Sequence, residues 1–448
     1  MTDPAETLRY AWREFVVLVA LIGRLGPLEA AGKLMPFVLL FELPVYATIL
    51  AGVFLHWWRQ RTTPPVRQPH HPSVSCIVAC YAEGDEIRRT VHSLLEQLYP
   101  GKIEILLVVD GSLRNAATLR AAEDSAARAP RRANRSIIVL PKPQRGGRVS
   151  SINAGLAVAS GEIVMALDGD TSFDNDMVAN AARYFRDPNV AGVAGNLRVR
   201  NARATLVTRL QAVEYMLSIH TGKIGLDHFN VVNNISGAFG VFRRDFVRQI
   251  GGWDSGTAED LDLTIRIKKY FGRHPNLRIR FAPDAMGHTD APDTLRGFFK
   301  QRHRWDGDLF YLYVRKHWRA LTPALLGWRN FVMLMWTGVY FQLVLPFAIA
   351  LSTVWVFCTY SIHAVLAVLL LVYLFYLLLT VILYAVHVGM VSERPRQDLA
   401  LWWCLPLFPL LAFATRVWCG ISTVSELVFK AHLDSSMAPW WVLRKTKF

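Results

Sequence analysis

Two carboxylates follow a strongly apolar run near the middle of the sequence. Residues 163–167 are apolar without interruption, which is typical of a strand buried on both faces of a parallel sheet, and Asp168-Gly169-Asp170 follows at once. Open α/β sheets bind ligands at the carboxyl ends of their strands, and Gly169 lets the backbone turn there. Mg²⁺ or Mn²⁺ is commonly held by one or two carboxylates together with substrate phosphates. The motif therefore predicts a metal and diphosphate site, although taken alone it also fits a polar turn.

Other polar groups that could do chemistry lie in the same central region: Asp110, Glu259-Asp260 and Gln301-Arg302-His303-Arg304-Trp305. Asp110 ends a second apolar run. The acidic pair begins an expected helix, where the helix dipole favours carboxylates, so a plain capping role also explains it. The Gln-x-x-Arg-Trp segment stands in a basic, aromatic stretch typical of a helix in the membrane interface, where an interfacial Arg and a buried Trp are the plain alternative.

The elements around these motifs alternate between strands and helices. We expect strands at 74–79, 103–109, 137–140 and 163–167, and helices at 85–97 and 151–159. Such alternation implies a parallel sheet with right-handed crossovers, and the pattern becomes mixed after residue 171. The sequence has no Gly-x-Gly-x-x-Gly motif and no Walker loop, which argues against a dinucleotide enzyme or a P-loop ATPase.

The composition indicates a membrane protein with a globular middle. Hydrophobic residues make up 52% of the 448, and they are concentrated at the two ends of the chain. The net charge of +15 fits cytoplasmic-side Lys and Arg beside membrane spans, and no basic-aromatic module for nucleic acid is present, so we expect no nucleic-acid partner. The cysteines show neither zinc spacing nor a disulfide framework, and Cys76 and Cys80 are expected to be small buried hydrophobes.

Several stretches are apolar enough to lie in a bilayer. Residues 35–58, 331–357 and 362–388 are long enough to cross it, whereas 15–22 is short and fits either an interfacial helix or a short span. Residues 401–415 contain two prolines and are expected to be kinked or re-entrant, with 416–429 completing the membrane region, which gives three to five spans. Glu42 within the first span is expected to face protein. Arginines directly after that span place the next domain in the cytoplasm.

Taken together, the acidic motifs, the Gln-x-x-Arg-Trp motif and the flanking spans resemble the processive family 2 glycosyltransferases, which include cellulose, chitin, hyaluronan and poly-N-acetylglucosamine synthases. The resemblance extends from the first firm span to the last. It implies an α/β fold: a cytoplasmic GT-A-like mixed sheet with helices on both faces, flanked by transmembrane helices and amphipathic interface helices. The expected organisation is membrane segments at 1–60, a linker at 61–72, the glycosyltransferase domain at 73–290, interface helices with the Gln-x-x-Arg-Trp motif at 291–328, a transmembrane region at 329–430 and a basic tail at 431–448.

The resemblance also implies roles for individual residues. Asp260, with Glu259, matches the general base, and Asp168 and Asp170 match the motif that meets ribose and a Mg²⁺ or Mn²⁺ cofactor. The remaining matches are to nucleotide contacts and to the mouth of a translocation channel: Tyr81, Glu83, Asp110 and Arg148 for the nucleotide, and Gln301, Arg304 and Trp305 for the channel mouth. The implied reaction is a single displacement that inverts an α-linked donor to a β-linkage.

Some residues depart from the usual family pattern. Ala258 stands where many members have Thr, Arg148 where they have Lys, and Asp306-Gly307-Asp308 where the stretch is usually less acidic. Length, the two flanking membrane regions and residues 195–200 are most similar to poly-N-acetylglucosamine synthases. The implied partners are a UDP-sugar, best assigned as UDP-GlcNAc, a growing polysaccharide, the lipid bilayer and, as in some members, a small membrane accessory subunit. The implied location is the bacterial inner membrane.

Three other functions stay open at this point. The first is a β-glucan synthase that uses UDP-glucose. The second is a non-processive transferase that places one sugar on a polyprenyl phosphate, which the Gln-x-x-Arg-Trp motif disfavours. The third is a catalytically inactive membrane scaffold, which the joint presence of Asp168, Asp170, Asp260 and Arg304 disfavours.

Overall fold

The structure, a computed structural model, describes residues 4–25, 29, 32, 36–63, 70–130, 133–254 and 258–429. The expected basic tail at 431–448 and the middle half of the linker at 61–72, residues 64–69, lie outside these residues, as does Thr257.

Within the described residues, eight strands form one mixed sheet in the order β3-β2-β1-β4-β7-β6-β8-β5. The first four strands along the chain are parallel to their neighbours, and β7 then pairs antiparallel with β4. The strands are β1 (Val74–Cys80), β2 (Ile103–Asp110), β3 (Arg135–Lys142), β4 (Ile163–Asp168), β5 (Ser172–Phe173), β6 (Val190–Val199), β7 (Phe239–Arg243) and β8 (Arg278–Thr289). The expected mixed sheet is confirmed.

Both faces of the sheet are buried because successive side chains of a strand point to opposite sides. In β4, Ile163, Met165 and Leu167 join one hydrophobic core, and Val164 and Ala166 join the other. The first core packs under α4 (Ile87–Leu95), α5 (Ala116–Arg128), α7 (Met177–Ala182) and α8 (Leu206–Glu214). The second packs under α6 (Gly147–Val158), α10 (Arg244–Gln249) and α11 (Glu259–Lys268). Cys76 and Cys80 are buried, as expected.

The sequence-based expectations for the early elements are confirmed with small shifts. The expected strands at 74–79, 103–109, 137–140 and 163–167 correspond to β1 to β4. The expected helix at 85–97 is a short 3-10 turn, η2 (Gly84–Glu86), followed by α4, and α6 begins four residues before the expected start at 151. Helix α5 was not expected, because its Ala-rich sequence has a weak apolar stripe; a second short turn, η3 (Arg183–Arg186), follows α7.

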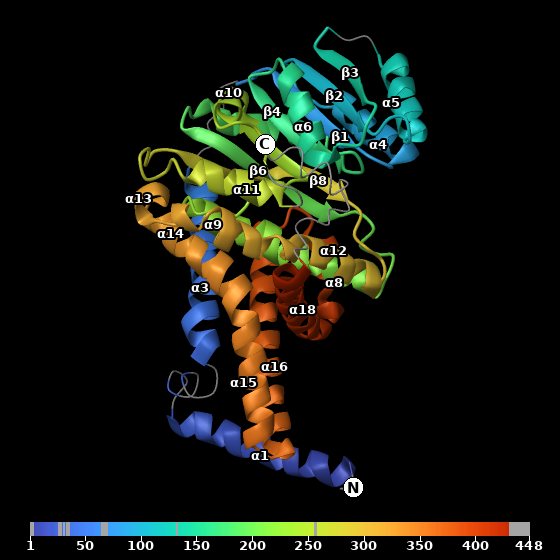
Figure 1. Cartoon of the computed structure of the whole chain (residues 1–448). Coiled ribbons are helices and arrows are strands. Elements are labelled where there is room, and N and C mark those ends of the chain that lie inside the picture. Colours follow the sequence, from blue (N-terminus) through green and yellow to red (C-terminus); the bar gives the residue numbers. More distant parts are fainter. Residues whose placement is uncertain are drawn as a thin grey trace.

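A layer of helices lies between the sheet and the membrane helices (Figure 1). It consists of α8, η4 (Tyr215–Thr221), α9 (Gly222–His228), α12 (Leu295–Gly307), η5 (Tyr311–Lys316), η6 (Trp318–Ala320) and α13 (Pro323–Leu326). The membrane region consists of α1 (Pro4–Leu25), η1 (Val38–Glu42), α3 (Leu43–Thr62), α14 (Trp328–Leu334), η7 (Met335–Val344), α15 (Leu345–Thr359), α16 (Ile362–Val386), η8 (His387–Val391), α17 (Pro395–Leu399), η9 (Trp402–Leu407) and α18 (Phe408–Phe429).

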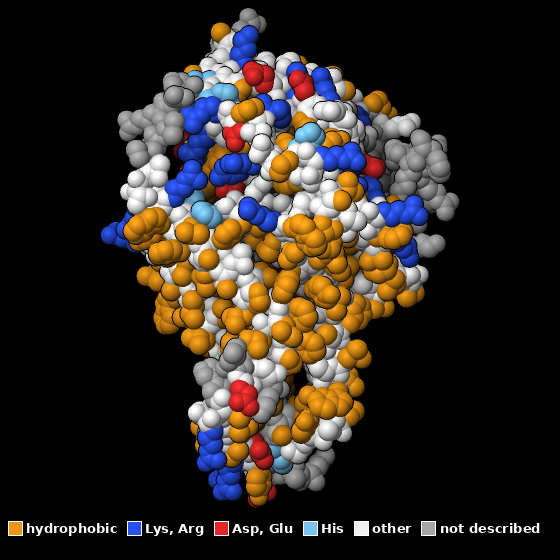
Figure 2. All heavy atoms as spheres, turned by 90° about the vertical axis from the view of Figure 1, so that its left-hand side faces the viewer, with side chains coloured by type: hydrophobic (Ala, Val, Ile, Leu, Met, Phe, Trp, Pro, Cys, Tyr) orange, Lys and Arg blue, Asp and Glu red, His pale blue; other side chains and the backbone are white. Residues whose placement is uncertain are grey.

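Among the described residues, four helices are long and apolar enough to cross a membrane: Val38–Thr62, Trp328–Thr359, Ile362–Val391 and Trp402–Val428. Figure 2 shows hydrophobic side chains covering this half of the molecule, with Lys and Arg side chains gathered above them. Helix α1 is not among the four candidates; it lies across the far ends of α15 and α16 in Figure 1, which favours the interfacial alternative. Glu42 is only 2% exposed and faces protein as expected, with a carboxylate oxygen 3.9 Å from Nη2 of Arg416.

Helix α3 is joined to the helix layer below the sheet by a contact between two glycines. A Cβ atom added at Gly52 of α3 would overlap the backbone of Gly225 in α9, and one added at Gly225 would overlap the backbone of Ile49. Small residues let two helix backbones approach this closely. This crossing fixes the position of α9, and therefore of the sheet above it, relative to the bilayer.

Candidate functional site

The structure brings the predicted polar groups to one edge of the sheet. Tyr81 and Glu83 follow β1, Asp110 ends β2, Asp168 ends β4 and Asp170 follows it. The three strands are neighbours in the order β2-β1-β4 and run parallel, so their carboxyl ends meet. This is the edge at which open α/β sheets bind ligands.

Arg148, at the start of α6, joins three separate segments at this edge. Its Nη1 forms an ion pair with Asp168, and its Nε donates to Oε1 of Glu259 over 2.7 Å. Its Nη2 donates to the backbone carbonyl of Gly237 over 2.5 Å. The side chain is only 8% exposed, so these charge-assisted bonds form in a low-dielectric setting. One guanidinium thus holds the end of β4, the start of α11 and the Gly-rich turn together.

The acidic pair at the start of α11 is not a helix cap. The N-cap residue is Ala258, and no side-chain capping bond is formed there. Glu259 is buried against Arg148 instead, and burial raises its pKa to about 7, an effect that the positive charge of Arg148 opposes. Both acids nevertheless lie in the first turn of α11, where the helix dipole favours carboxylates, and Glu259 has the Arg148 guanidinium as an additional partner.

Asp260 keeps partial exposure and lies next to the turn that Arg148 holds. Its Oδ2 accepts a hydrogen bond from the backbone N–H of Gly237 and another from Nδ2 of Asn234, each over 3.0 Å. Its Oδ1 accepts from the backbone N–H of Leu261 over 2.7 Å. These three hydrogen bonds fix the orientation of the Asp260 side chain beside Glu259.

The residues around Asp168 and Asp170 fit a hard divalent cation. Of the described residues, no group of three or more His, Cys, Asp or Glu is arranged as a complete metal site. The carboxyl of Glu83 nevertheless lies against Gly169, and its Oε2 is buried without a hydrogen-bond partner among the described residues. Burial raises the pKa of Glu83, and the negative charge of Asp170 adds to that rise. Excess negative charge with an unsatisfied oxygen suits a site completed by a cation and phosphate oxygens.

Tyr81 and Asp110 are both engaged by neighbouring basic groups. The guanidinium of Arg145 lies 4.0 Å from the centre of the Tyr81 ring, which is 44% exposed. Asp110 is buried; it accepts from Nζ of Lys142 and from the backbone N–H groups of Gly146 and Gly147, each over 2.8 Å. Asp110 therefore shapes the loop that leads to Arg148.

The Gln-x-x-Arg-Trp segment lies on α12. Oε1 of Gln301 is buried without a hydrogen-bond partner among the described residues, and Arg304 is exposed. The Trp305 ring is 39% exposed, with the guanidinium of Arg302 lying 4.4 Å from its centre. Trp305 is thus not the fully buried residue of the plain alternative.

Helix α12 packs along α18. The rings of Phe299 and Trp418 have centroids 5.0 Å apart, and Nδ1 of His303 lies 3.0 Å from Oγ of Ser422. The segment is therefore supported by the last candidate span.

Arg302 is a functional candidate that sequence reasoning missed. It is 9% exposed, and its Nη2 donates to Oε2 of Glu214 over 2.5 Å. Burial raises the pKa of Asp306 to about 7; the positive charge of Arg302 lowers it and the charge of Glu214 raises it. Burial also raises the pKa of Tyr215 to about 12, and Asp170 adds to that rise.

Lys223 is a second missed residue. It is 6% exposed in α9, and burial lowers its pKa to about 8 while the charge of Asp260 opposes that shift. No sequence signal pointed to it, because a lone Lys after Thr221-Gly222 carries no motif. For Arg302, the available signal was its position inside the Gln-x-x-Arg-Trp segment.

Comparisons with known proteins agree with this geometry. Residues 71–307 match the family described as "Glycosyltransferase like family 2". The poly-beta-1,6-N-acetyl-D-glucosamine synthase of Staphylococcus aureus (strain MSSA476) is 29% identical over 278 residues, which cover 60% of this chain and 64% of that protein. The synthase of the same name from Staphylococcus epidermidis is 28% identical over 256 residues, 57% of this chain and 58% of that one. The match thus spans less than two thirds of these relatives.

A solved structure has a similar fold. It is the mannosyltransferase PcManGT from Pyrobaculum calidifontis in complex with GDP-Man and Mn²⁺, with a TM-score of 0.50 and 18% sequence identity. The similarity covers 86% of this chain and 99% of that one. At this identity the likeness concerns the fold alone, which supports the GT-A-like assignment.

Proposed function

The chain belongs to the glycosyltransferase like family 2, and on that premise we propose that it is a membrane-embedded, inverting enzyme that polymerises a β-linked polysaccharide from a UDP-sugar. The observation that carries the proposal is the Arg148 cluster. It holds Asp168 of the donor side and Glu259 of the base side around one turn, with Asp260 bonded to the same turn.

The donor would lie over the ends of β1, β2 and β4. We assign Tyr81, Glu83, Asp110 and Arg148 to the nucleotide and its phosphates. Asp168 and Asp170 would hold Mg²⁺ or Mn²⁺, which as a Lewis acid would help the nucleoside diphosphate to leave. The relative with a similar fold was solved with Mn²⁺ and a nucleotide sugar, which supports this assignment. Arg148 contributes positive charge next to the same phosphates.

Asp260 would be the general base. It takes the proton from the acceptor hydroxyl while that oxygen attacks the anomeric carbon, and the bond to the diphosphate breaks on the opposite face. Glu259 is occupied by Arg148 and more deeply buried, so we assign it to positioning the turn that carries the N–H donor to Asp260. The pair therefore divides into a base and a support.

Processive synthesis is supported by α12. Trp305 offers an aromatic face that suits the terminal sugar of a polymer, and α12 is seated on α18. We propose that Gln301, Arg304 and Trp305 form the acceptor side of the site and lead to a translocation channel through the bilayer. The domain at 73–290 and the interface helices at 291–328 would lie at the entrance of this channel.

UDP-GlcNAc is the best candidate donor because the similar staphylococcal proteins are named poly-beta-1,6-N-acetyl-D-glucosamine synthases. UDP-glucose and a β-glucan product remain the alternative. We place the enzyme in the bacterial inner membrane with its catalytic domain in the cytoplasm. The contact between Arg394, in the loop between two candidate spans, and Asp174 of the catalytic domain puts that loop on the same side. A small membrane accessory subunit is part of the proposal.

The test is synthesis by the purified chain in lipid nanodiscs. UDP-GlcNAc, UDP-glucose and UDP-GlcA are supplied separately with Mg²⁺ or Mn²⁺, and UDP release and product length are measured. We expect UDP release with UDP-GlcNAc and a long product that a linkage-specific hydrolase digests. Trp305→Ala should shorten the product while the protein stays folded. A lipid-extractable monosaccharide conjugate as the product would refute polymer synthesis. Absence of UDP release from every donor would refute the proposal that the chain is a UDP-sugar transferase.

A further inference from the structure

A pocket of about 700 Å³ lies between the catalytic sheet and the membrane region, away from the Asp260 turn. Its walls come from four parts of the chain: the end of β6 with the loop to residue 204, one side of α8 and η4, His288 of β8, and residues 394–403, which lead into the last candidate span. The proposed function assigns nothing to this pocket.

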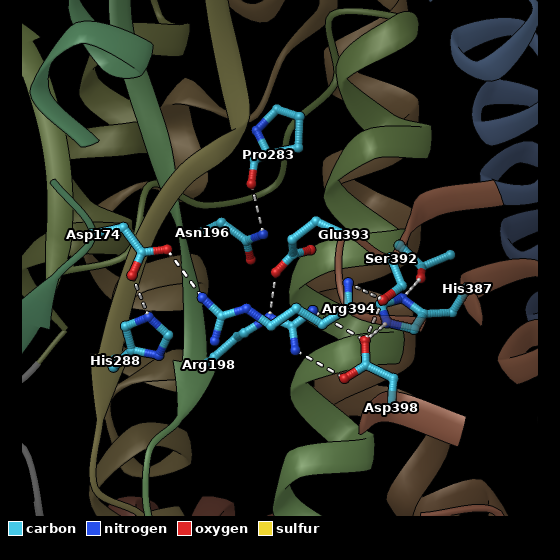
Figure 3. A network of polar contacts seen from close by, with 11 residues as sticks. Asp174, Asn196, Arg198, Pro283, His288, His387, Ser392, Glu393, Arg394 and Asp398 are labelled. Atoms are coloured by element: carbon cyan, nitrogen blue, oxygen red, sulfur yellow. Dashed lines mark hydrogen bonds and ion pairs between the residues drawn. The ribbon is translucent and has the colours of Figure 1, made fainter. Parts of the chain in front are cut away.

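The base of the pocket is built from a buried polar network (Figure 3). Nη1 and Nη2 of Arg198 donate to the two oxygens of Asp398 over 2.8 and 3.0 Å. Oγ of Ser392 also donates to Asp398, and Nε2 of His387 lies 3.2 Å from it. Asp398 is 1% exposed, so the loop at 392–400 is fixed on β6. A pocket with such a base is preformed.

The charges that line the pocket are not balanced. Asp398 is the one acid among the residues that line the pocket. Five arginines line it: Arg198, Arg200, Arg203, Arg209 and Arg394. Three of these arginines have carboxylate partners: Arg198 has Asp398 and Glu393, Arg200 has Asp290, and Arg394 has Asp174. Within the described part of the chain, neither Arg203 nor Arg209 has one. The pocket therefore presents two uncompensated guanidinium groups.

These two arginines are adjacent and sit beside a tryptophan. Nη2 of Arg209 donates to the backbone carbonyl of Arg203 over 3.2 Å, and its guanidinium lies 5.3 Å from the centre of the Trp403 ring. Trp402 and Trp403 begin the fourth candidate span and are 63% and 44% exposed. Leu206, on the same helix as Arg209, is 40% exposed. Exposed Trp beside Arg at the start of a span marks the level of lipid headgroups.

We propose that this pocket binds the phosphate of an anionic membrane lipid. Arg203 and Arg209 bind the phosphate oxygens, and Trp403 lies at the level where the headgroup joins the acyl chains. Guanidinium groups bind phosphate through paired N–H donors, and basic pockets at this depth bind anionic headgroups. The occupant would tie the loop at 392–400 and α8 to the bilayer surface.

The test is native mass spectrometry of the full chain, purified in detergent and titrated with phosphatidylglycerol or phosphatidylcholine. We expect tight retention of phosphatidylglycerol and about thirtyfold weaker retention by the double variant Arg203→Ala, Arg209→Ala, as for the loss of two basic contacts to the phosphate. The matched control is Arg120→Ala, Arg128→Ala on α5, which removes the same charge from exposed positions in the catalytic half. It should retain the lipid as the parent does.

Further arms identify the source of the phosphate. Equal retention of both lipids, or equal loss in both double variants, overturns the proposal. Binding of inorganic phosphate at the same arginines with no lipid retained overturns the lipid assignment in favour of a soluble phosphate ligand. If the double variant fails to fold, judged by its thermal transition, Arg203→Gln alone is used, because this exposed side chain makes no side-chain hydrogen bond within the described part of the chain. Lipid retention is independent of sugar transfer, so the result does not depend on the proposed function.

Discussion

Nε of Arg148 lies 2.7 Å from Oε1 of Glu259, although the two residues are separated by 111 positions in the chain. Both side chains are less than a tenth exposed. The ion pair fastens the start of α11 to the start of α6, and the same guanidinium reaches Asp168. The relative position of the end of β4 and the start of α11 therefore depends on one arginine.

Replacing Arg148 should separate the end of β4 from the start of α11. Arg148→Lys keeps the charge but loses the planar fork, and Arg148→Ala leaves the buried Glu259 carboxylate without a partner. We expect Arg148→Ala to lower the free energy of unfolding by about 3–5 kcal/mol, the usual cost of removing one partner of a buried ion pair. Thermal unfolding and UDP release measure the two effects. Arg120→Lys, on the surface of α5, is the control. An unchanged transfer rate in Arg148→Lys would contradict the claim that the planar guanidinium, and not the positive charge alone, holds the site.

Asp260 and Asp170 should fail in different ways. Asp260→Asn removes the proton acceptor, so transfer should fall by about 10³-fold, within the range of general base catalysis, while UDP binding stays close to that of the parent. Asp170→Ala should instead weaken UDP binding in the presence of Mg²⁺ or Mn²⁺, with less effect in its absence. Isothermal titration and UDP release measure both. Equal loss of binding in the two variants would show that the roles are not separate.

The Glu259 carboxyl should give transfer an acidic limb near neutral pH. Burial raises its pKa to about 7, and only the ionised form pairs with Arg148. Transfer should therefore fall as the pH is lowered from about 8 to about 6. The Glu259→Gln variant should transfer sugar slowly, and its rate should not fall over this pH range. If the fall persists in this variant, another group is responsible for it.

The same carboxyl should influence stability with the opposite sign. Its pKa in the folded protein lies above the ordinary value of 4.5, so the folded state binds more protons than the unfolded state in the window between the two values. Its contribution to the free energy of unfolding should therefore decline as the pH rises from about 4.5 to about 7. Comparing urea unfolding of the parent and Glu259→Gln across this window measures the difference.

Two arginines on α12 offer a matched comparison. Arg302 is buried against Glu214 and the Trp305 ring, whereas Arg304 is exposed. Arg302→Ala should destabilise the protein by about 1–3 kcal/mol, because the half-buried Glu214 carboxylate loses its charge-assisted partner. Arg304→Ala should leave the thermal transition in place and reduce polymer formation. Similar transitions in the two variants would mean that the Arg302 ion pair is not structural.

The glycine contact between α3 and α9 should tolerate no side chain. Gly225→Ala would push a methyl group into the backbone of Ile49, so we expect a lower thermal transition and loss of transfer in nanodiscs. Gly389→Ala is the control, because nothing lies within 4 Å of a Cβ atom at that position. If both variants behave like the parent, α9 is not held by this crossing.

The sequence was most informative where local pattern decides structure. The apolar runs of β1, β2 and β4 placed Asp110 and Asp168 at strand ends, because a buried parallel strand needs apolar side chains on both faces. The division between Glu259 and Asp260 could not be read from their adjacent positions. It depends on Arg148, which reaches Glu259 only after the sheet has formed.

The buried Arg302 shows a second limit. Its neighbour Arg304 belongs to the motif, but the turn of α12 points Arg302 toward Glu214 and Trp305, so the arginine outside the motif is the buried one. The strand order β7-β6-β8 could not be predicted from the sequence either, because the strands that pair there come from distant segments of the chain. Periodicity reports which face is buried and not which strand lies beside it.

The helix that carries Trp305 is fastened to α18 through Phe299 and His303. A shift of α18 within the bilayer is therefore transmitted to the tryptophan without passing through the sheet. Under the proposed function, lipid thickness and lateral pressure would act on the position of Trp305, and we expect chains of different length in membranes of different composition.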